Sequence, residues 1–154
     1  MDSLYQEIIL DHYRNPVGRG LRDPYEAEVH HVNPTCGDEI TLRVHLEGTG
    51  ESAVVADVSY DNQGCSISQA SASVMYELLL GRTIAQGMAT HEAFLALMQS
   101  ATDESGAEPD EDVLEDAIAF SGVAKYPARV KCALLSWMAW KDAVSQAQTH
   151  GGNT

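Results

Sequence analysis

Basic residues are scarce in this 154-residue sequence, with nine lysines and arginines against 23 aspartates and glutamates and a formal net charge of -14. A surface of that sign repels phosphates, so we expect neither a nucleic-acid partner nor binding to an anionic membrane. No apolar run approaches the roughly 20 residues that a membrane helix needs. The first residues are acidic and then amphipathic, unlike a signal or transit peptide, which predicts a cytoplasmic protein.

Cysteine is also sparse, and its spacing excludes several familiar motifs. The three cysteines are Cys36, Cys65 and Cys132. An odd number of thiols in a reducing compartment does not make a disulfide framework. The sequence contains no C-x-x-C pair, which argues against a zinc ribbon or a thioredoxin-type motif. One interpretation is that all three are buried thiols that act as small hydrophobic residues.

The hydrophobic pattern predicts one α+β domain, because strand-like segments come first and helical segments follow. We expect a three-stranded antiparallel sheet covered by helices on one side, with an N-terminal helix and a long C-terminal helix. The single domain is predicted to span 1–148, followed by a flexible tail at 149–154. The predicted strands are 27–32, 40–46 and 54–60, and the predicted helices are 3–13, 66–80, 90–98, 113–120 and 127–148.

Two further features of this pattern concern the helical half of the chain. The acidic stretch at 102–112 contains proline and glycine and is predicted to be a solvated loop. The small residues at 68–73 predict a helix face that packs closely against the sheet, and they could also give access to Cys65.

Each cysteine is predicted to lie at the end of an element, where metal ligands are common. Cys36 falls in a loop between two strands, Cys65 between the third strand and a helix, and Cys132 about one turn inside the last helix. Loops and helix N-termini offer space and a dipole that favours a thiolate. Asp38 is two residues beyond Cys36 and completes a four-ligand set of the kind zinc prefers. Alternatively, Asp38 is an ordinary turn residue.

The charges around such a set point in the same direction. Three thiolates and one carboxylate would give a divalent ion a net charge of -2, which Arg129 and Lys131 could offset. Both cations are equally well explained as residues of a helix surface. None of the six histidines is adjacent to a cysteine in the sequence, which weakens a cysteine hydrolase interpretation. His12 ends the first predicted helix, where a capping or surface role is the simpler explanation.

Four motifs occur in a diagnostic order. They are DHYRNP at 11–16, NPTCGD at 33–38, GCSIS at 64–68 and PARVKC at 127–132. Together they resemble the IscU/NifU N-terminal family of iron–sulfur assembly proteins, and more closely its SufU branch. The resemblance covers residues 3 to about 145.

Two features select the SufU branch. Lys131 precedes the last cysteine where iron–sulfur scaffolds carry histidine. The stretch between the last two cysteines is also longer than in scaffolds, through the region around 82–110. A lysine ammonium is a poor metal ligand, so Lys131 weighs against a scaffold that binds a cluster through a residue at this position.

The resemblance implies an IscU/SufU-like fold and a zinc-dependent sulfurtransferase that works in SUF iron–sulfur cluster assembly. The zinc ligands would be Cys36, Asp38, Cys65 and Cys132. The partner would be a SufS-type pyridoxal-phosphate cysteine desulfurase, one histidine of which would replace Cys36 on zinc. The freed Cys36 would take up the partner's persulfide sulfur and pass it to the SufBCD scaffold.

Elementary chemistry is consistent with this scheme. Zinc holds thiolates deprotonated at neutral pH, so a released Cys36 would start as a nucleophile. Zinc has no strong geometric preference, so a ligand exchange is feasible. Asp38 is a harder ligand than a thiolate and would loosen the site. Arg129 and Lys131 could stabilise the persulfide anion or contact the partner, and we expect a monomer in isolation.

Three alternatives remain at this point. The first is an IscU-type scaffold that binds an iron–sulfur cluster through the same cysteines. The second is a structural zinc module that only mediates interactions, in which Cys36 would be as inert as Cys65. A cysteine hydrolase ranks last, because no histidine or oxyanion motif accompanies a cysteine.

Overall fold

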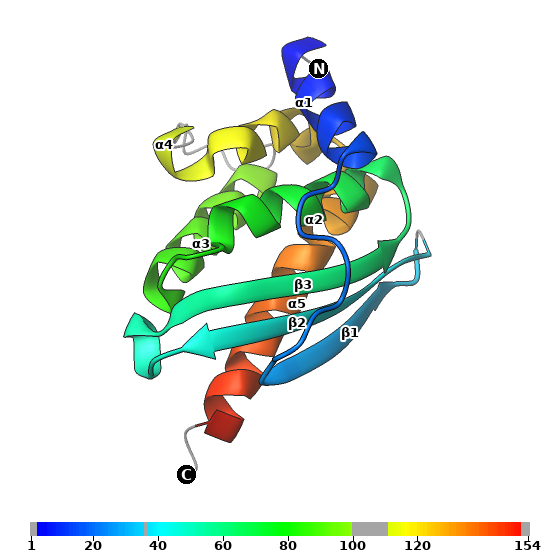
Figure 1. Cartoon of the computed structure of the whole chain (residues 1–154). Coiled ribbons are helices and arrows are strands. Elements are labelled where there is room, and N and C mark those ends of the chain that lie inside the picture. Colours follow the sequence, from blue (N-terminus) through cyan, green and yellow to red (C-terminus); the bar gives the residue numbers. More distant parts are fainter. Residues whose placement is uncertain (1–2, 36, 100–110, 152–154) are drawn as a thin grey trace.

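The computed structural model describes residues 3–35, 37–99 and 111–151. Cys36 and residues 102–110 of the predicted acidic loop lie outside the described residues. The described chain is an α+β structure, as predicted, in which three strands are followed by helices (Figure 1). No helix in these ranges is both long and apolar enough to cross a membrane.

The order of the elements agrees with the prediction, because an N-terminal helix is followed by three strands and then by helices. The strands are β1 (Ala27–Asn33), β2 (Asp38–Glu47) and β3 (Val54–Gln63). The α-helices are α1 (Ser3–Arg14), α2 (Ser66–Leu79), α3 (Ile84–Gln99), α4 (Glu111–Leu114) and α5 (Pro127–Gly151), and the 3-10 helices are η1 (Gly50–Ser52) and η2 (Glu115–Lys125).

The three strands form an antiparallel sheet in the order β1-β2-β3. Strand β2 alternates buried and half-buried residues with a period of two, because successive side chains point to opposite faces of a strand. Its buried residues are Asp38, Ile40, Leu42 and Val44. The register pairs Asn33 with Asp38, so the β1–β2 turn brings the first residue of β2 beside the last residue of β1.

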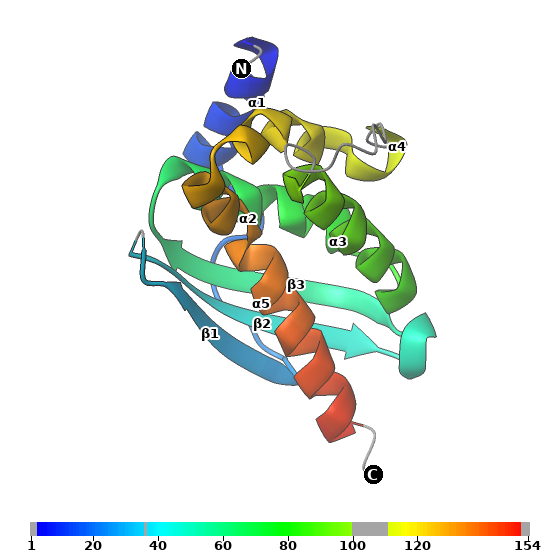
Figure 2. The same cartoon turned by 180° about the vertical axis from the view of Figure 1, so that it is seen from behind.

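The helices cover one face of the sheet. Seen from behind, α5 crosses β1 and β2 obliquely while α2 and α3 lie beside it (Figure 2). The core between them is rich in large rings, and Phe94 stacks on Trp137 with centroids 4.7 Å apart. Burial of such side chains supplies most of the driving force for folding, at about 25 cal/mol per Å² of apolar area.

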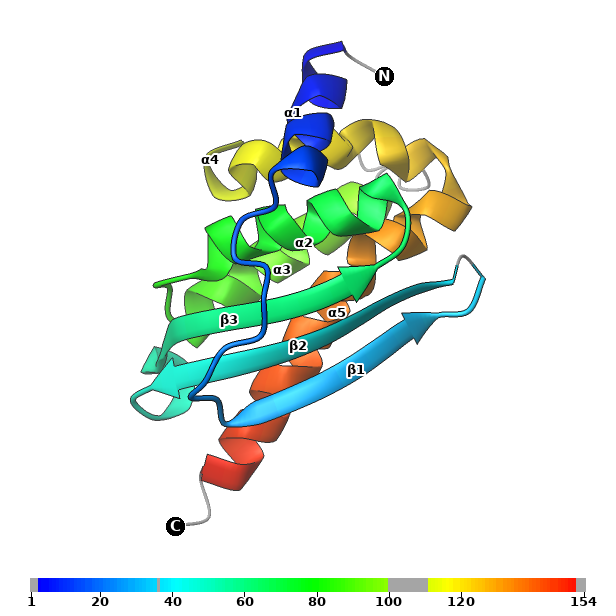
Figure 3. The same ribbon diagram turned by 45° about the vertical axis from the view of Figure 1, so that its right-hand side comes forward.

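The connection between α1 and β1 runs along the sheet on its other side (Figure 3). The Gly20 N–H donates to the Tyr60 carbonyl at 2.7 Å, and the Tyr60 hydroxyl donates to the Val17 carbonyl at 2.7 Å. Arg22 pairs with Asp57 through two hydrogen bonds of 3.0 Å. This connection therefore covers part of β3, which explains why Val58, Ser59 and Tyr60 are all buried.

Several helix boundaries differ from the sequence-based prediction, and the predicted helix at 113–120 is a short α4 followed by η2, which continues to Lys125. Helix α3 begins at Ile84, six residues before the predicted start at Thr90. Residues 111–112, predicted to be part of the acidic loop, belong to α4. Helix α5 continues to Gly151, beyond the predicted end at Gln148, and the division into a domain at 1–148 and a tail stays a prediction.

The buried face of α1 does not follow its apolar residues alone. Leu4 and Tyr13 are exposed by 63% and 40%, whereas His12 is buried. The His12 Nδ1 atom lies 2.7 Å from the Ser73 hydroxyl of α2. The capping or surface role expected for His12 is therefore wrong, because this histidine fastens α1 to α2.

Candidate metal centre

Three of the four predicted ligands converge at one end of the sheet. One carboxylate oxygen of Asp38 and the sulfur atoms of Cys65 and Cys132 all lie within 4.8 Å of one another. They come from the start of β2, the start of α2 and the second turn of α5. Cys36, the fourth predicted ligand, lies outside the described residues.

Asp38 is buried because side chains alternate between the two faces of β2. It points to the same face as Ile40 and Leu42 and is completely buried. Its Oδ1 atom accepts a hydrogen bond of 2.9 Å from the Cys65 backbone N–H, and its Oδ2 atom lies 3.7 Å from the Cys65 sulfur. An ordinary turn aspartate would be solvated, so burial beside two thiols favours a ligand role.

Gly64 leaves the space that Asp38 occupies. Its φ of 148° lies in a region that residues with a side chain rarely adopt. A Cβ at this position would overlap the Asp38 carboxylate and the Ser68 hydroxyl. The glycine therefore permits both the sharp exit from β3 and the approach of the carboxylate to the end of that strand.

Cys65 is the N-cap residue of α2, with φ and ψ of -71° and 167°. Its side chain makes no capping hydrogen bond, which leaves the sulfur available to the site. The N-terminus of α2, which carries the positive end of the helix dipole, begins at the next residue. This sulfur is half-buried, whereas Asp38 and Cys132 are fully buried.

Cys132 lies within α5, five residues after the proline that begins the helix. Proline is well suited to the first helical position because its missing N–H would have no partner there. The Asn33 side-chain amide donates to the Cys132 sulfur at 3.9 Å, and the Asn33 Oδ1 atom accepts from the Thr35 N–H at 3.3 Å. Asn33 thus holds a hydrogen-bond donor against the Cys132 sulfur, a role that sequence reasoning missed although Asn33 opens the NPTCGD motif.

The donor set fits a zinc ion. Two sulfur atoms and a carboxylate oxygen, all brought together from separate elements, are the ligand types of four-coordinate zinc sites. The backbone N–H on Asp38 and the amide on Cys132 supply the outer layer of hydrogen bonds that orients such ligands. Two thiols that served only as packing residues would have no reason to converge on one buried carboxylate, so the observed arrangement argues against a purely packing role for Cys65 and Cys132.

Arg129 and Lys131 are exposed on α5 beside this centre. In the described part of the chain neither side chain has a hydrogen bond or ion pair, which leaves both free to meet an approaching anion or partner. Their predicted role stays a prediction.

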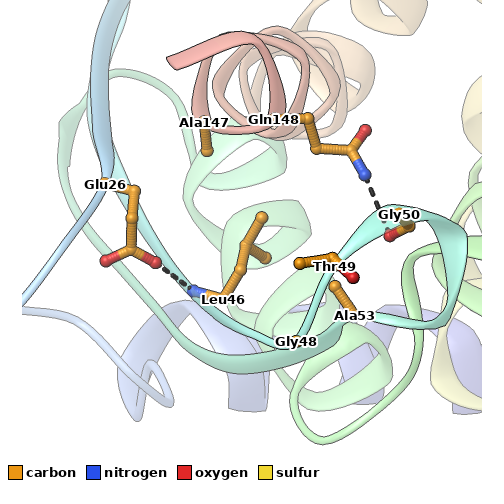
Figure 4. A pocket seen from close by; sticks show the side chains of 8 residues that line it. All are labelled: Glu26, Leu46, Gly48, Thr49, Gly50, Ala53, Ala147 and Gln148. Atoms are coloured by element: carbon orange, nitrogen blue, oxygen red, sulfur yellow. Dashed lines mark hydrogen bonds between the residues drawn. The ribbon is translucent and has the colours of Figure 1, made fainter. Parts of the chain in front are cut away.

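A pocket at the opposite end of β2 and α5 is a less convincing site (Figure 4). It has a volume of about 340 Å³ and lies between the β2–β3 connection and the end of α5. The Glu26 carboxylate accepts from the Leu46 N–H at 2.6 Å, and the Gln148 amide donates to the Gly50 carbonyl at 3.0 Å (Figure 4). These polar groups already bond to the backbone around the β2–β3 connection. The cysteine end of the sheet is therefore the stronger candidate for a functional site.

Comparison with protein families decides the family to which this arrangement belongs. Residues 4–133 match the family model of the NifU-like N-terminal domain. The chain belongs to this family. The match includes all three cysteines and Asp38, and it confirms the resemblance to the IscU/NifU family that the four motifs indicated.

Individual relatives of the NifU-like chain agree with this assignment. It is 41% identical to the zinc-dependent sulfurtransferase SufU of Bacillus subtilis, over 99% of this chain and 96% of the relative. It is 35% identical to the iron–sulfur cluster assembly scaffold protein IscU of Thermotoga maritima, over 93% of this chain and 94% of the relative. Both relatives therefore match along nearly their whole lengths.

A solved structure shows the same fold in three dimensions. It is a SUF-system protein of Fervidobacterium islandicum, assigned as an iron–sulfur cluster assembly scaffold. Its TM-score is 0.76 at 34% identity, covering 90% of this chain and 94% of that one. The predicted IscU/SufU-like fold is confirmed.

Proposed function

We propose that this NifU-like protein is a zinc-dependent sulfur carrier of SUF iron–sulfur cluster assembly. The observation that supports it most is the convergence of Asp38, Cys65 and Cys132 within 4.8 Å. A sulfur carrier needs a thiol that is kept reduced and ionised until a donor arrives, and a zinc–thiolate centre provides that condition. The 41% identity to a protein named as a zinc-dependent sulfurtransferase supports the same reaction class.

Asp38, Cys65 and Cys132, with Cys36 as the fourth ligand, would hold the zinc ion. When bound, zinc supplies a positive charge that keeps the thiols ionised at neutral pH. Asp38 contributes a carboxylate that the Cys65 backbone N–H already orients. Asn33 offers a hydrogen bond to the Cys132 sulfur, which stabilises its negative charge.

Cys36 is the residue that we assign as sulfur acceptor. Its thiolate attacks the outer sulfur of a persulfide on a cysteine desulfurase of the SufS type. A new S–S bond forms on Cys36, the S–S bond of the donor breaks, and the donor cysteine leaves as a thiolate. The outer sulfur keeps its proton or loses it to water, so no external oxidant or reductant is required. The Cys36 persulfide then passes its sulfur to a scaffold of the SufBCD type.

Exposed side chains next to the centre suit a protein partner. Val32, which precedes Asn33, and Tyr126, which precedes the first residue of α5, are exposed by 51% and 59%. Large apolar side chains at the edge of a reactive centre are common in protein interfaces. Arg129 and Lys131 would place positive charge where a persulfide anion must pass.

An iron–sulfur scaffold is the second candidate, because several similar proteins are named as scaffolds. Lys131 is the residue that favours a carrier. A protonated lysine has no lone pair for iron, and it stands before Cys132 where the scaffold pattern has histidine. A cytoplasmic location and a monomeric state stay predictions.

Stimulation of a SufS-type cysteine desulfurase tests the proposed function. Wild-type protein, a Cys36→Ala variant and a Lys131→Ala variant are compared, with zinc, iron and sulfide measured on the same samples. We expect about one zinc per chain in the wild type and strong stimulation that the Cys36→Ala variant loses. Mass spectrometry should find an added sulfur atom on Cys36 after single turnover.

The other outcomes separate the candidates. Zinc without stimulation, or persulfide on the desulfurase alone, would contradict the carrier and leave a structural zinc module. Iron with acid-labile sulfide in place of zinc would contradict it in favour of the scaffold. The Lys131→Ala variant tests the role of the lysine ammonium. Slower sulfur transfer at unchanged zinc content would show that Lys131 stabilises the persulfide anion.

A further inference from the structure

A second cluster of metal-ligating side chains lies among the helices, away from the cysteines. It contains His12 of α1, Glu77 of α2 and Asp116 of η2. One ligand atom from each residue lies within 4.8 Å of the other two. These residues are far apart in the sequence, and none of them belongs to the proposed sulfur-carrier chemistry.

The separations between these atoms match those required around one ion. The His12 Nε2 atom is 3.0 Å from Asp116 Oδ2 and 3.7 Å from Glu77 Oε2. Ligands held about 2.0–2.2 Å from a tetrahedral or octahedral ion stand about 3.0–3.5 Å apart. A small adjustment of the two half-exposed carboxylates would therefore bring all three atoms onto one cation.

Hydrogen bonds on the far side of the His12 ring prepare its Nε2 atom for a positive group. The Ser73 hydroxyl oxygen accepts from the Val17 N–H at 2.9 Å and lies 2.7 Å from His12 Nδ1. In the tautomer whose Nδ1–H donates to Ser73, as the outer nitrogen of a metal-bound histidine normally does, Nε2 is free to bind a metal ion.

The Nε2 atom of this tautomer carries a lone pair that faces the Asp116 carboxylate. A metal ion placed between these two lone pairs would bind both, whereas without an ion the other tautomer lets Nε2–H donate to Asp116 and Nδ1 accept from Ser73. His12 is buried while Glu77 and Asp116 are about half exposed, so an ion has both a fixed nitrogen ligand and a path from solvent.

The surroundings add negative charge and space. A cavity of about 230 Å³ is lined by Glu77, Leu78, Glu115 and Asp116. Two carboxylates and a neutral imidazole would neutralise a divalent ion. Glu115 lines the cavity outside the three-ligand group, and it pairs with Arg82 at 3.4 Å.

The geometry points to a divalent transition-metal site formed by His12, Glu77 and Asp116, which joins α1 to α2 and η2. One imidazole nitrogen and two carboxylate oxygens suit ions such as Mn²⁺, Fe²⁺ and Zn²⁺, with water at the remaining positions. This site does not depend on the proposed function, because it shares no residue with the cysteine centre.

Mn²⁺ is the appropriate probe, because thiolate sites select softer ions and this ion reports on the nitrogen and oxygen ligands. Protein loaded with one equivalent of zinc is titrated with Mn²⁺ at about 0.15 M salt, where long-range attraction to the acidic surface is screened. Free Mn²⁺ is followed by electron paramagnetic resonance. We expect one saturable Mn²⁺ per chain, displaced by a second equivalent of Zn²⁺.

Isosteric variants identify the ligands. Asp116→Asn and Glu77→Gln should each weaken Mn²⁺ binding at least tenfold, whereas the matched Glu115→Gln variant should stay within about twofold of wild type. The Asp116→Asn change keeps an acceptor for His12, so folding is preserved, and unchanged zinc content would show that the cysteine centre is intact. Absence of saturable Mn²⁺ binding, or equal weakening in Glu115→Gln, would overturn the site.

Discussion

At the scale of single residues, the Asp38 carboxylate requires that position 64 have no side chain. A Gly64→Ala variant would place a methyl group against the Asp38 carboxylate and impose an unfavourable φ. Such backbone strain costs about 1–3 kcal/mol. We expect lower thermal stability together with a loss of most of the bound zinc, measured by calorimetry and elemental analysis.

Gly81 provides the control for this substitution. It also has a positive φ, of 79°, but a Cβ there would meet no atom within 4 Å. Gly81→Ala should therefore lose stability through strain while keeping its zinc. Full zinc content in Gly64→Ala would show that the space beside Asp38 is not critical for the metal centre.

Tyr60 links the stability of the fold to alkaline pH. Burial raises the pKa of its hydroxyl to about 12, above the usual value of 10. The folded chain keeps a proton that the unfolded chain releases, so stability from this group is complete below pH 10 and is lost as pH rises towards 12. The linked free energy is about 2–3 kcal/mol.

Tyr60→Phe tests this linkage. The variant loses the hydrogen bond to Val17, which should cost about 1 kcal/mol near neutral pH. Its disadvantage relative to wild type should shrink between pH 10 and 12, measured by urea unfolding across that range. A constant difference between the two proteins would mean that the Tyr60 hydroxyl ionises equally in the folded and unfolded states.

Helix α3 shows, at the scale of elements, which local signal sequence reasoning overlooked. The Thr83 hydroxyl accepts from the Gln86 N–H at 3.1 Å, and the Gln86 side chain accepts from the Thr83 N–H at 3.0 Å. This is a capping box of the T-x-x-Q type. The pattern is visible in the sequence, but the helix start was predicted at Thr90, whose hydroxyl in fact donates to the Gln86 carbonyl inside the helix at 3.1 Å.

Thr83→Ala tests the energetic role of this capping box. The variant should destabilise the fold by about 1 kcal/mol, measured by chemical denaturation. Thr49→Ala is the matched control, because Thr49 precedes η1 without a capping side-chain hydrogen bond, and its effect should stay within about 0.5 kcal/mol. Equal effects of both substitutions would contradict a capping role for Thr83.

The other elements were predicted correctly where a local sequence pattern determines them, and incorrectly where long-range contacts do. The strands were predictable because one face is buried and the alternation is regular, as in β2. The buried side of α1 was misjudged, because His12 lies one turn beyond Ile8 and Ile9 but was treated as a polar end residue. Its partners Ser73 and Asp116 come from other elements, and no local pattern reports such long-range contacts.

For the candidate centre, the sequence predicted the ligands but not the residues that support them. Motifs identified Asp38, Cys65 and Cys132, and the structure brings these three together. The supporting contacts were not predictable, since Asn33 meets Cys132 only through the packing of α5 against β1. A sequence names the reactive side chains more readily than the groups that orient them.

The metal centre should stabilise the whole molecule, because its ligands join the sheet to two helices. Zinc that binds the folded chain alone adds about 2.7 kcal/mol at a free concentration one hundred times the dissociation constant. For a chain of this size, chelation should then lower the melting temperature by about 5–10 °C. Calorimetry before and after zinc removal measures this shift, and re-addition of zinc should restore it.

A second measurement guards against a trivial effect of the chelator. Cys132→Ser protein, which lacks one buried ligand, should melt at a lower temperature and respond little to chelation. If wild-type protein melts at the same temperature with and without zinc, the centre does not contribute to global stability.

The positions of the ligands along the chain also set an order of events during synthesis. Asp38 and Cys65 leave the ribosome early, whereas Cys132 follows 67 residues after Cys65 and lies in the last helix. Closing so long a loop carries an entropic cost that the short β1–β2 and β2–β3 connections do not. A nascent chain that ends before α5 would display two cysteines and a carboxylate without a finished cage. Tight metal capture would thus mark the completed polypeptide and distinguish it from its truncated precursors.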